Sequence, residues 1–599
     1  MEYGTSPSLT AMFFEKAEAL AERPFLWAKR DGVYRPQTWR EVAEQVGLLA
    51  RALRARGVGN GDRVVLISEN RPEWLIADLA IMSAGAITVP AYTTNTEADH
   101  RHILNDSGAV AVIVSTPALA RRLLPAIMDA RSCRLVVSMA PLELDQAPDV
   151  EIYAWDDLMS GAGETPDEVS ELVGKTEPDD VACFIYTSGT SGAPKGVMLT
   201  HRNMLANCRG AYILLRRIGL GREVFLSFLP LSHSYEHTAG QFFPISIGAE
   251  IYYAEGAETL LTNLAEVRPT IMTAVPRLYE SMHLRIRRTM DKEQGLKKRL
   301  FELAVELGCK RSQGSGKLSF KEWLLDRLVE RLVRGKMRKR FGGRLKAMVS
   351  GGAALNPDIG HFFTALGLRI LQGYGQTEAA PLISANPPDR VKIETVGPPV
   401  DGVEVQIAED GEILVRGDLV MKGYWRAPEA TAETIRDGWL HTGDIGELDE
   451  DGYLKITDRK RDIIVFSGGD NVSPARVEGF LTLEPEISQA MVYGDKRPHL
   501  VGLLVPDEEF LRHWALNNGR RADLAELAGA PELHKALSPV VDRVNEKLSS
   551  LEKVRRFMIA PAPFTVDNAM MTPTLKIRRH KIKAAYGEDL KGLYQVASS

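Results

Sequence analysis

The chain has 599 residues, of which 44% are hydrophobic and 26% charged, and its formal net charge is −5. This length exceeds what one hydrophobic core supports, so we expect two or more domains of an ordinary soluble globular protein. The four cysteines form no C-x-x-C pair, and no apolar run approaches the length of a membrane span, which excludes a disulfide framework and a transmembrane class.

The first part of the chain alternates between helix-like and strand-like stretches. Apolar residues recur at helical spacing over 39–54 and 76–84, whereas 63–68 and 111–115 are short apolar runs typical of buried strands. Such alternation predicts an α/β architecture with substantially parallel sheets. It indicates a fold class that many functions share.

A loop rich in glycine and hydroxyl groups follows the strand-like run 181–185. The residues Tyr186–Lys195 read Y-T-S-G-T-S-G-A-P-K. Glycines let backbone N–H groups turn toward an anion, hydroxyls add donors, and the lysine supplies a point charge for phosphate. The spacing differs from that of a Walker loop. The loop predicts phosphate binding, with an ordinary surface turn as the alternative.

A strongly basic segment covers residues 285–346. It carries 20 Lys/Arg against 7 Asp/Glu, a net charge of +13, while the whole chain is negative. Leucines at helical spacing predict amphipathic helix, with a break at 314–316. Two interpretations stay open: contact with anionic lipid, or a solvated helical face whose apolar side lies in the core. Nucleic acid is disfavoured because aromatic residues are sparse there.

Later fragments supply the remaining chemistry of a nucleotide site. Gly351-Gly352-Ala353 could form a flat backbone shelf after an apolar run. Tyr374 precedes the carboxylate Glu378 by four residues; an aromatic ring suits a purine, and a carboxylate suits Mg²⁺. Asp444 could accept hydrogen bonds from a ribose diol, and Arg459 could offer a guanidinium to the same sugar or phosphate. Each fragment alone could be a turn or a solvated loop.

The order T-S-G-T-S-G-x-P-K-G, followed by these fragments in sequence, closely resembles the adenylate-forming (AMP-binding) superfamily. Within it, the chain is most similar to the long-chain fatty-acid–CoA ligases. The resemblance implies an α/β fold with a large N-terminal domain of packed sheets and helices, 1–458, and a small mobile α+β C-terminal domain, 459–599. The position matching the hinge of the family is Arg461.

The resemblance also implies ATP, Mg²⁺ and CoA. The residues expected to bind ATP or AMP are Thr187, Ser188, Gly189, Thr190, Ser191, Gly192, Lys195, Gly351, Gly352, Ala353, Gly373, Tyr374, Gly375, Gln376, Thr377, Asp444, Arg459 and Lys576. Glu378 and Thr187 are expected to hold Mg²⁺. The catalytic set implied by the family is Lys576, Glu378, Thr187 and His233.

Lys576 lies in Thr572-Pro573-Thr574-Leu575-Lys576, where most of the superfamily has Gly in place of Leu575. The long-chain branch commonly has T-P-T-x-K, so this departure fits that branch. His233 matches a position that often contacts the substrate carboxylate. The residues expected at the mouth of an acyl tunnel are Tyr235 and His237, and those expected beside the path of CoA are Ser467, Gly468 and Gly469.

The activity implied is ATP-dependent conversion of a long-chain fatty acid to acyl-AMP and then to acyl-CoA, with release of pyrophosphate and AMP. Two alternatives remain: an acyl-AMP ligase that transfers to the phosphopantetheine of a carrier protein, and a catalytically silent fatty-acid-binding protein. The first residues lack the basic and apolar features of a signal peptide. We therefore expect a cytoplasmic protein, peripheral at the cytoplasmic membrane face, with no nucleic-acid partner.

Overall fold

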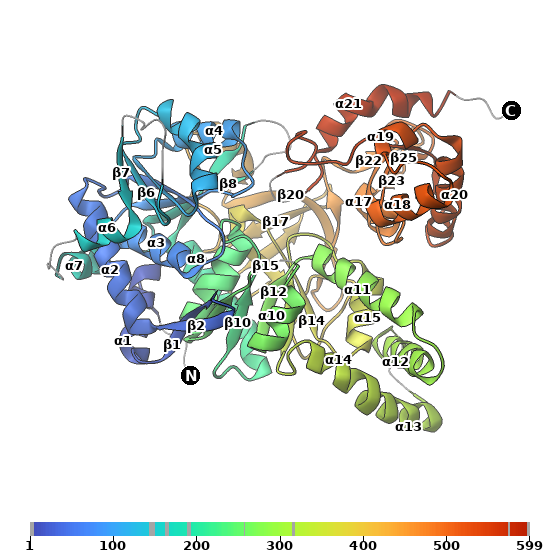
Figure 1. The fold of residues 1–599 in the computed structure, drawn as a ribbon, viewed down its shortest axis with the longest axis horizontal. Coiled ribbons are helices and arrows are strands. Elements are labelled where there is room, and N and C mark those ends of the chain that lie inside the picture. The colour runs from blue at the N-terminus through green and yellow to red at the C-terminus, as the bar shows by residue number, and fades with distance from the viewer. Residues whose placement is uncertain are drawn as a thin grey trace.

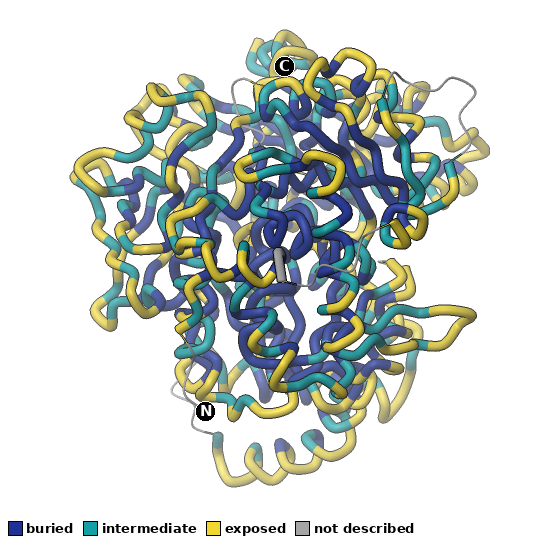
Figure 2. Tube along the Cα trace, turned by 90° about the vertical axis from the view of Figure 1, so that its left-hand side faces the viewer, coloured by how far each residue is buried: buried dark blue, intermediate teal, exposed yellow. Residues whose placement is uncertain are grey.

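The computed structural model describes residues 5–142, 150–161, 167–187, 193–256, 258–313, 318–572 and 576–595. Figure 1 shows a large body of sheets and helices, a helical arm at one side, and a smaller C-terminal unit above that arm. This arrangement confirms the predicted α/β fold class. Buried residues follow the packed strands in the interior, whereas exposed residues lie on outer helices and loops (Figure 2).

Sheet I contains the strand that precedes the glycine- and hydroxyl-rich loop. In spatial order its strands are β18 (Gly423–Tyr424), β9 (Lys195–Thr200), β8 (Val181–Thr187), β4 (Ile87–Pro90), β3 (Arg63–Ile67), β5 (Ala111–Val114), β6 (Leu135–Ser138) and β7 (Glu151–Ala154). From β8 to β7 the neighbouring strands are parallel, while β9 and β18 add an antiparallel edge.

Sheet II is likewise parallel at its centre. Its strands, in spatial order, are β15 (Leu382–Ala385), β14 (Ile370–Gly375), β13 (Ala347–Ser350), β12 (Ile271–Ala274), β10 (Val224–Ser227), β11 (Glu250–Tyr253), β1 (Pro24–Arg30) and β2 (Val33–Thr38). Only the outermost pairs, β14–β15 and β1–β2, are antiparallel among its described strands.

Helix α3 (Pro72–Ser83) lies between the two sheets. It is apolar on nearly all sides and contacts β3 and β4 of sheet I and β1 of sheet II. The apolar helical pattern in the sequence begins at residue 76, inside this helix, and Pro72 occupies the first turn, where a missing N–H is harmless. The helices around the two sheets are α1 (Leu9–Leu20), α2 (Trp39–Ala55), α4 (Glu97–Ser107), α5 (Pro117–Met128), α6 (Trp155–Ser160), α7 (Asp167–Lys175), α8 (His201–Leu215), the π-helix η2 (Glu236–Phe242), α9 (Phe243–Ile247) and α10 (Leu260–Val267).

Helix α2 and strands β3 and β5 confirm the corresponding sequence predictions to within one residue. A Thr38–Glu41 capping box starts α2, and its buried residues recur at helical spacing. These elements therefore illustrate local patterns that agree with the tertiary structure.

The helical arm contains most of the basic segment. It consists of α11 (Pro276–Asp291), α12 (Leu296–Gln313), α13 (Phe320–Val329), the π-helix η3 (Glu330–Arg334) and α14 (Gly335–Arg340), and α12 packs on α15 (Pro357–Ala365). A Cβ atom at Gly308 would stand 2.4 Å from the Cα of Ala365, so glycine permits this close approach of α12 and α15. The predicted helical character is confirmed, whereas the predicted break at 314–316 lies outside the described residues.

Sheet III joins the large body to the C-terminal unit. It is antiparallel, with β16 (Glu404–Ile407), β17 (Glu412–Arg416), β20 (Trp439–Leu448) and β19 (Ile435–Arg436) in spatial order, and β21 (Leu454–Arg459) paired with β20. Strand β21 extends to Arg459, so the Asp458–Arg459 pair lies at the end of a strand.

The C-terminal unit has its own core, whose buried residues come from positions 464 to 590. Its elements are β22 (Ile464–Val465), β23 (Asn471–Val472), α17 (Pro474–Leu481), β24 (Ile487–Tyr493), β25 (Leu500–Pro506), α18 (Glu508–Asn517), α19 (Leu524–Leu527), α20 (Pro531–Glu546), β26 (Val554–Ile559) and α21 (Arg579–Gly592). A separate core allows this unit to move as a body.

Candidate active site

Loops at the carboxyl edge of sheet II bring several predicted site residues together. His233 follows β10, Gly351 follows β13 and Glu378 follows β14, and these strands run in the same direction. In open α/β sheets, ligands bind at this edge because the loops from neighbouring parallel strands converge there. A Cβ atom at Gly375 would stand 1.8 Å from the carbonyl oxygen of Pro381, so glycine is required where the chain turns from β14 toward Glu378.

Tyr374, Asp444 and Arg459 form one connected group. The Tyr374 hydroxyl donates to Asp444 Oδ2 at 2.6 Å, and Arg459 Nε lies 3.5 Å from Asp444 Oδ1. The last two residues face each other in the β20–β21 pairing. Burial raises the pKa of Asp444, while Arg459 and the Tyr374 hydroxyl act in the opposite direction. Burial also raises the pKa of Tyr374, so its hydroxyl stays a hydrogen-bond donor.

Lys576 reaches this group from the C-terminal unit. The residue as a whole is exposed, but burial of its ammonium group among protein atoms lowers its pKa to about 8. The nearby positive charge of Arg459 acts in the same direction, and the charge of Asp444 acts in the opposite one. The backbone N–H of Lys576 donates to Thr572 Oγ1 at 3.1 Å. Three residues further on, Arg579 Nη1 donates to the buried Glu478 Oε1 of α17 at 2.6 Å, which anchors the segment that carries the lysine.

His233 lies near the same lysine in its neutral form. Burial lowers the pKa of His233 to about 4, and the charge of Lys576 acts in the same direction. The backbone N–H of Tyr235 donates to His233 Nδ1 at 3.1 Å, so the neutral ring carries its proton on Nε2. That N–H is then free to donate to an anionic ligand, which is the chemistry expected of a residue beside a substrate carboxylate.

A second group links Glu378 to the glycine- and hydroxyl-rich loop. The Tyr424 hydroxyl donates to Glu378 Oε1 at 2.8 Å, and Lys195 Nζ lies 5.0 Å from the centre of the Tyr424 ring. Lys195 pairs with Thr187 where β8 and β9 flank the loop. Arg461 is close enough for its charge to act on the Tyr424 hydroxyl. The loop flanks, the Glu378 carboxylate and Arg461 therefore lie around one tyrosine.

Ser188–Gly192, five predicted phosphate-binding residues, lie outside the described part of the chain. The described residues next to the site include Gly352, whose backbone φ of +82° favours glycine, and Thr377, whose Oγ1 lies 3.1 Å from Ser234 Oγ. Ala353 is exposed beside Gly352, as a ligand-facing shelf requires. Ser467, Gly468 and Gly469 form the turn between β22 and β23.

The two residues expected at an acyl tunnel are buried. The Tyr235 hydroxyl donates to the carbonyl oxygen of Val349 at 2.9 Å. His237 Nε2 lies 2.7 Å from Asp78 Oδ2, and its ring meets Trp74 edge to face. These contacts account for both side chains within the protein core, so a role at the acyl chain would require an internal tunnel rather than an open surface.

Sequence reasoning missed Tyr424. Its partner Glu378 lies 46 residues earlier, and no motif spacing connects the two. The signal available was Gly423, whose φ is +143°, followed by two aromatic residues. Such a short pattern is common in edge strands, and only the pairing of β18 with β9 brings it to the site.

Comparisons with known proteins agree with this geometry. The AMP-binding enzyme family matches residues 13–425, and the AMP-binding enzyme C-terminal domain matches residues 461–598. A long-chain-fatty-acid–CoA ligase, FadD15 of Mycobacterium tuberculosis, is 35% identical over 99% of this chain and 98% of its own length.

Two solved structures have the same fold. The A domain of a carboxylic acid reductase from Segniliparus rugosus, in complex with AMP and a co-purified carboxylic acid, has a TM-score of 0.75 at 21% identity and covers 99% of this chain and 95% of that one. The o-succinylbenzoate CoA synthetase of Bacillus subtilis, in complex with ATP and magnesium ion, has a TM-score of 0.67 at 21% identity. The match covers 96% of this chain and 99% of that one. The chain therefore belongs to the AMP-binding enzyme family, and long-chain-fatty-acid–CoA ligases are among its full-length relatives.

Proposed function

We infer that this protein is an AMP-forming acid–thiol ligase that converts a long-chain fatty acid to its CoA thioester through an acyl-adenylate. The observation that carries this inference is the meeting of Lys576, from the C-terminal unit, with Asp444, Arg459 and His233 of the large body. The 35% identity to long-chain-fatty-acid–CoA ligases, over nearly the full length of both chains, supports the substrate class.

In the first half-reaction, a carboxylate oxygen bonds to the α-phosphorus of ATP, and the bond to pyrophosphate breaks. Both reactants are anionic, so positioning and charge neutralisation must provide the catalysis. We assign Lys576 to the charge at the α-phosphate and carboxylate, and the Nε2–H of His233 to the carboxylate. Asp444 and Arg459 are assigned to the ribose, with Tyr374 beside the purine.

A magnesium ion fits Glu378. This residue is half-buried, and Tyr424 contacts one of its carboxylate oxygens, which leaves the other for a hard cation. Within the described residues no group of three or more His, Cys, Asp or Glu side chains could hold a metal alone, which suits an ion bound mainly by substrate phosphates. When bound with ATP, Mg²⁺ would neutralise phosphate charge. Thr187 is the second proposed protein ligand.

In the second half-reaction, the CoA thiol attacks the acyl carbonyl carbon, and AMP leaves. We propose that the C-terminal domain turns about Arg461, in the turn between β21 and β22, and withdraws Lys576. Strand β21 extends to Arg459 and pairs with β20 of the large body, so we place the boundary after Arg459, one residue later than the expected 458/459. The separate core of the C-terminal unit, which begins at residue 464, supports this division. The Ser467–Gly469 turn supplies small residues for a pantetheine arm. Alternating conformations allow one cavity to serve two reactions.

We place this activity in the cytoplasm, at the face of a membrane, because a long-chain fatty acid partitions into bilayers. The four cysteines are free thiols, as a reducing compartment favours. No helix in the described part of the chain is both long and apolar enough to span a membrane.

The test is the release of AMP and pyrophosphate from ATP with a series of fatty acids, with and without CoA. AMP formation over many turnovers that requires CoA and favours long chains is the expected result. Pyrophosphate release with retained acyl-adenylate and no response to CoA would instead indicate transfer to a carrier protein. No pyrophosphate release with any fatty acid would contradict the assignment.

A further inference from the structure

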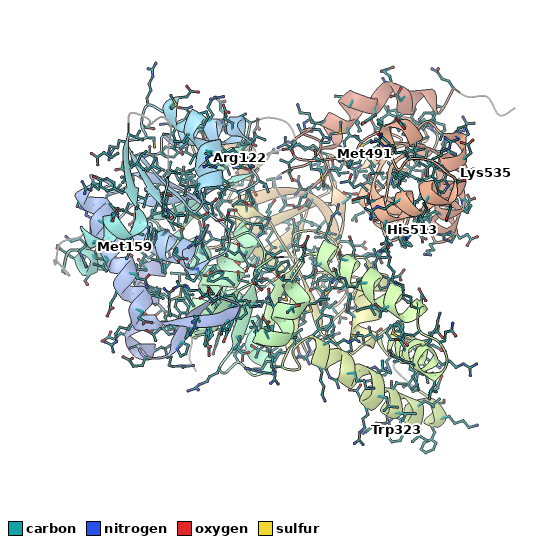
Figure 3. All side chains as sticks on the ribbon, viewed as in Figure 1. Arg122, Met159, Trp323, Met491, His513 and Lys535 are labelled. Carbon is teal, nitrogen blue, oxygen red and sulfur yellow. The ribbon has the colours of Figure 1, made fainter. Side chains whose placement is uncertain are left out.

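Helix α13 presents apolar side chains to solvent at the outer side of the helical arm. These six residues, which we call the α13 face, are 40% to 78% exposed: Phe320, Trp323, Leu324, Leu325, Leu328 and Leu332. Figure 3 shows Trp323 at the far end of the arm, directed away from the large body. From the sequence we expected the apolar side of this basic segment to lie either in the core or against anionic lipid. The exposure of these leucines contradicts the core alternative.

The acidic residues of the same helical run turn the other way. Glu322 is half-buried and pairs with Lys310, and Asp326 is buried and lies 2.7 Å from Arg334 Nη1. Glu330 pairs with Arg338 at 2.6 Å. The carboxylates of α13 and η3 are therefore paired with basic residues of α12, η3 and α14, so they do not offset the charge of the other basic residues of α13.

Basic residues lie among the apolar residues on the outward side. Lys321, Arg327 and Arg331 are exposed, and none of them forms an ion pair with another described residue. The guanidinium of Arg327 lies 5.1 Å from the centre of the Trp323 ring. Trp323 in turn stacks on Phe320, with ring centres 6.0 Å apart. The result is an aromatic and leucine surface interspersed with uncompensated positive charge.

We propose that the α13 face docks on an anionic lipid surface. Positive charge with leucines and aromatic rings on one side of a helix matches the boundary between lipid headgroups and acyl chains. An aqueous protein surface rich in acidic groups would match the charge but not six exposed apolar side chains. Arg334, which the basic run alone would include, is buried and paired, so it is excluded from the lipid-facing set.

The experiment compares wild type with two variants in flotation with vesicles of phosphatidylcholine, with and without phosphatidylglycerol, at low and high salt. The apolar variant combines Trp323→Ser, Leu324→Ser and Leu328→Ser. The charge variant combines Lys321→Gln, Arg327→Gln and Arg331→Gln. The matched control combines Leu516→Ser and Lys535→Gln, exposed residues of the C-terminal unit, where Lys535 is labelled in Figure 3.

Wild type and control should bind the phosphatidylglycerol vesicles, more weakly at high salt. Each basic residue near an anionic surface contributes about a fivefold factor, so the charge variant should bind about a hundredfold more weakly. The apolar variant should lose binding at both salt concentrations. Because all substituted residues are exposed, thermal melts should match wild type and establish that the variants are folded.

Binding that is indifferent to phosphatidylglycerol, or equal in all variants, would overturn the proposal. So would a wild-type dimer that the apolar variant converts to monomer without any vesicle binding, because the face would then join two copies of this chain. Thioester formation on a short, water-soluble acid is measured in parallel. A protein that binds vesicles but forms no thioester would refute the proposed activity and leave the lipid surface standing.

Discussion

Adenylation should fail at alkaline pH as Lys576 loses its proton. The pKa of this lysine is lowered to about 8 by the protein atoms around it and by Arg459. For a required ammonium with that pKa, only about a tenth of the free enzyme is active at about pH 9, whereas an ordinary lysine would be almost fully protonated there. The apparent second-order rate constant, kcat/KM, should therefore fall about tenfold between pH 7 and pH 9.

The assay is pyrophosphate release from ATP and a fatty acid without CoA, at substrate concentrations below KM. Lys576→Arg keeps a positive charge throughout this range, so its rate, although lower, should lack the alkaline decline. Folding lowers the lysine pKa, so the charged ammonium reduces stability below about pH 8, and this effect fades as the pH rises toward the unfolded value. Lys576→Met should consequently melt no lower than wild type. A wild-type rate that stays level to about pH 9.5, or an equal decline in Lys576→Arg, would refute the role of this proton.

Three further predictions concern other parts of the molecule. Arg288→Gln removes the 2.6 Å ion pair between Arg288 of α11 in the large body and Glu509 of α18 in the C-terminal unit, so pyrophosphate release should slow about two- to fivefold. The control is Arg512→Gln, which removes an exposed ion pair within α18. Equal effects of the two substitutions would contradict a role for the contact between the two units. Tyr424→Phe should lower kcat/KM for MgATP about tenfold because Glu378 loses a hydrogen bond, and an unchanged value would remove Tyr424 from the site. Burial raises the pKa of Glu236 to about 7, so this carboxyl stabilises the fold most below about pH 4.5 and loses up to about 3 kcal/mol as the pH rises through 7. Glu236→Gln should lack that loss in urea unfolding at pH 5 and pH 8, and identical pH dependence in both proteins would contradict it.

Elements with a strong local pattern were predictable. The α2 helix has both a capping box and an amphipathic face, and β3 and β5 are short apolar runs bounded by polar residues. Apolar periodicity alone gives no boundary for α3, because this helix is apolar on nearly all sides. The orientation of α13 was not predictable. Leucines at helical spacing indicate that a helix has an apolar face, but they do not indicate whether that face lies in the core or in solvent.

The candidate site shows the same division. The order of the motifs along the chain predicted Glu378, Asp444 and Lys576 as separate site residues, since each lies in a recognisable fragment. The approach of Lys576 to Asp444 depends on the packing of the C-terminal unit against the large body, which no spacing encodes. The hydrogen bond from Tyr374 to Asp444 joins residues 70 positions apart, and the burial of His237 against Asp78 joins residues 159 apart. Such contacts follow from tertiary packing alone.

The most direct measurement supplies a synthetic long-chain acyl-adenylate and CoA to wild type and to Lys576→Ala, and compares thioester formation with pyrophosphate release from ATP. The account predicts that the variant loses adenylation by a factor of about a hundred or more but forms the thioester from the adenylate at close to the wild-type rate. Equal loss of both half-reactions, or wild-type pyrophosphate release, would contradict a lysine that serves the first half-reaction and withdraws for the second.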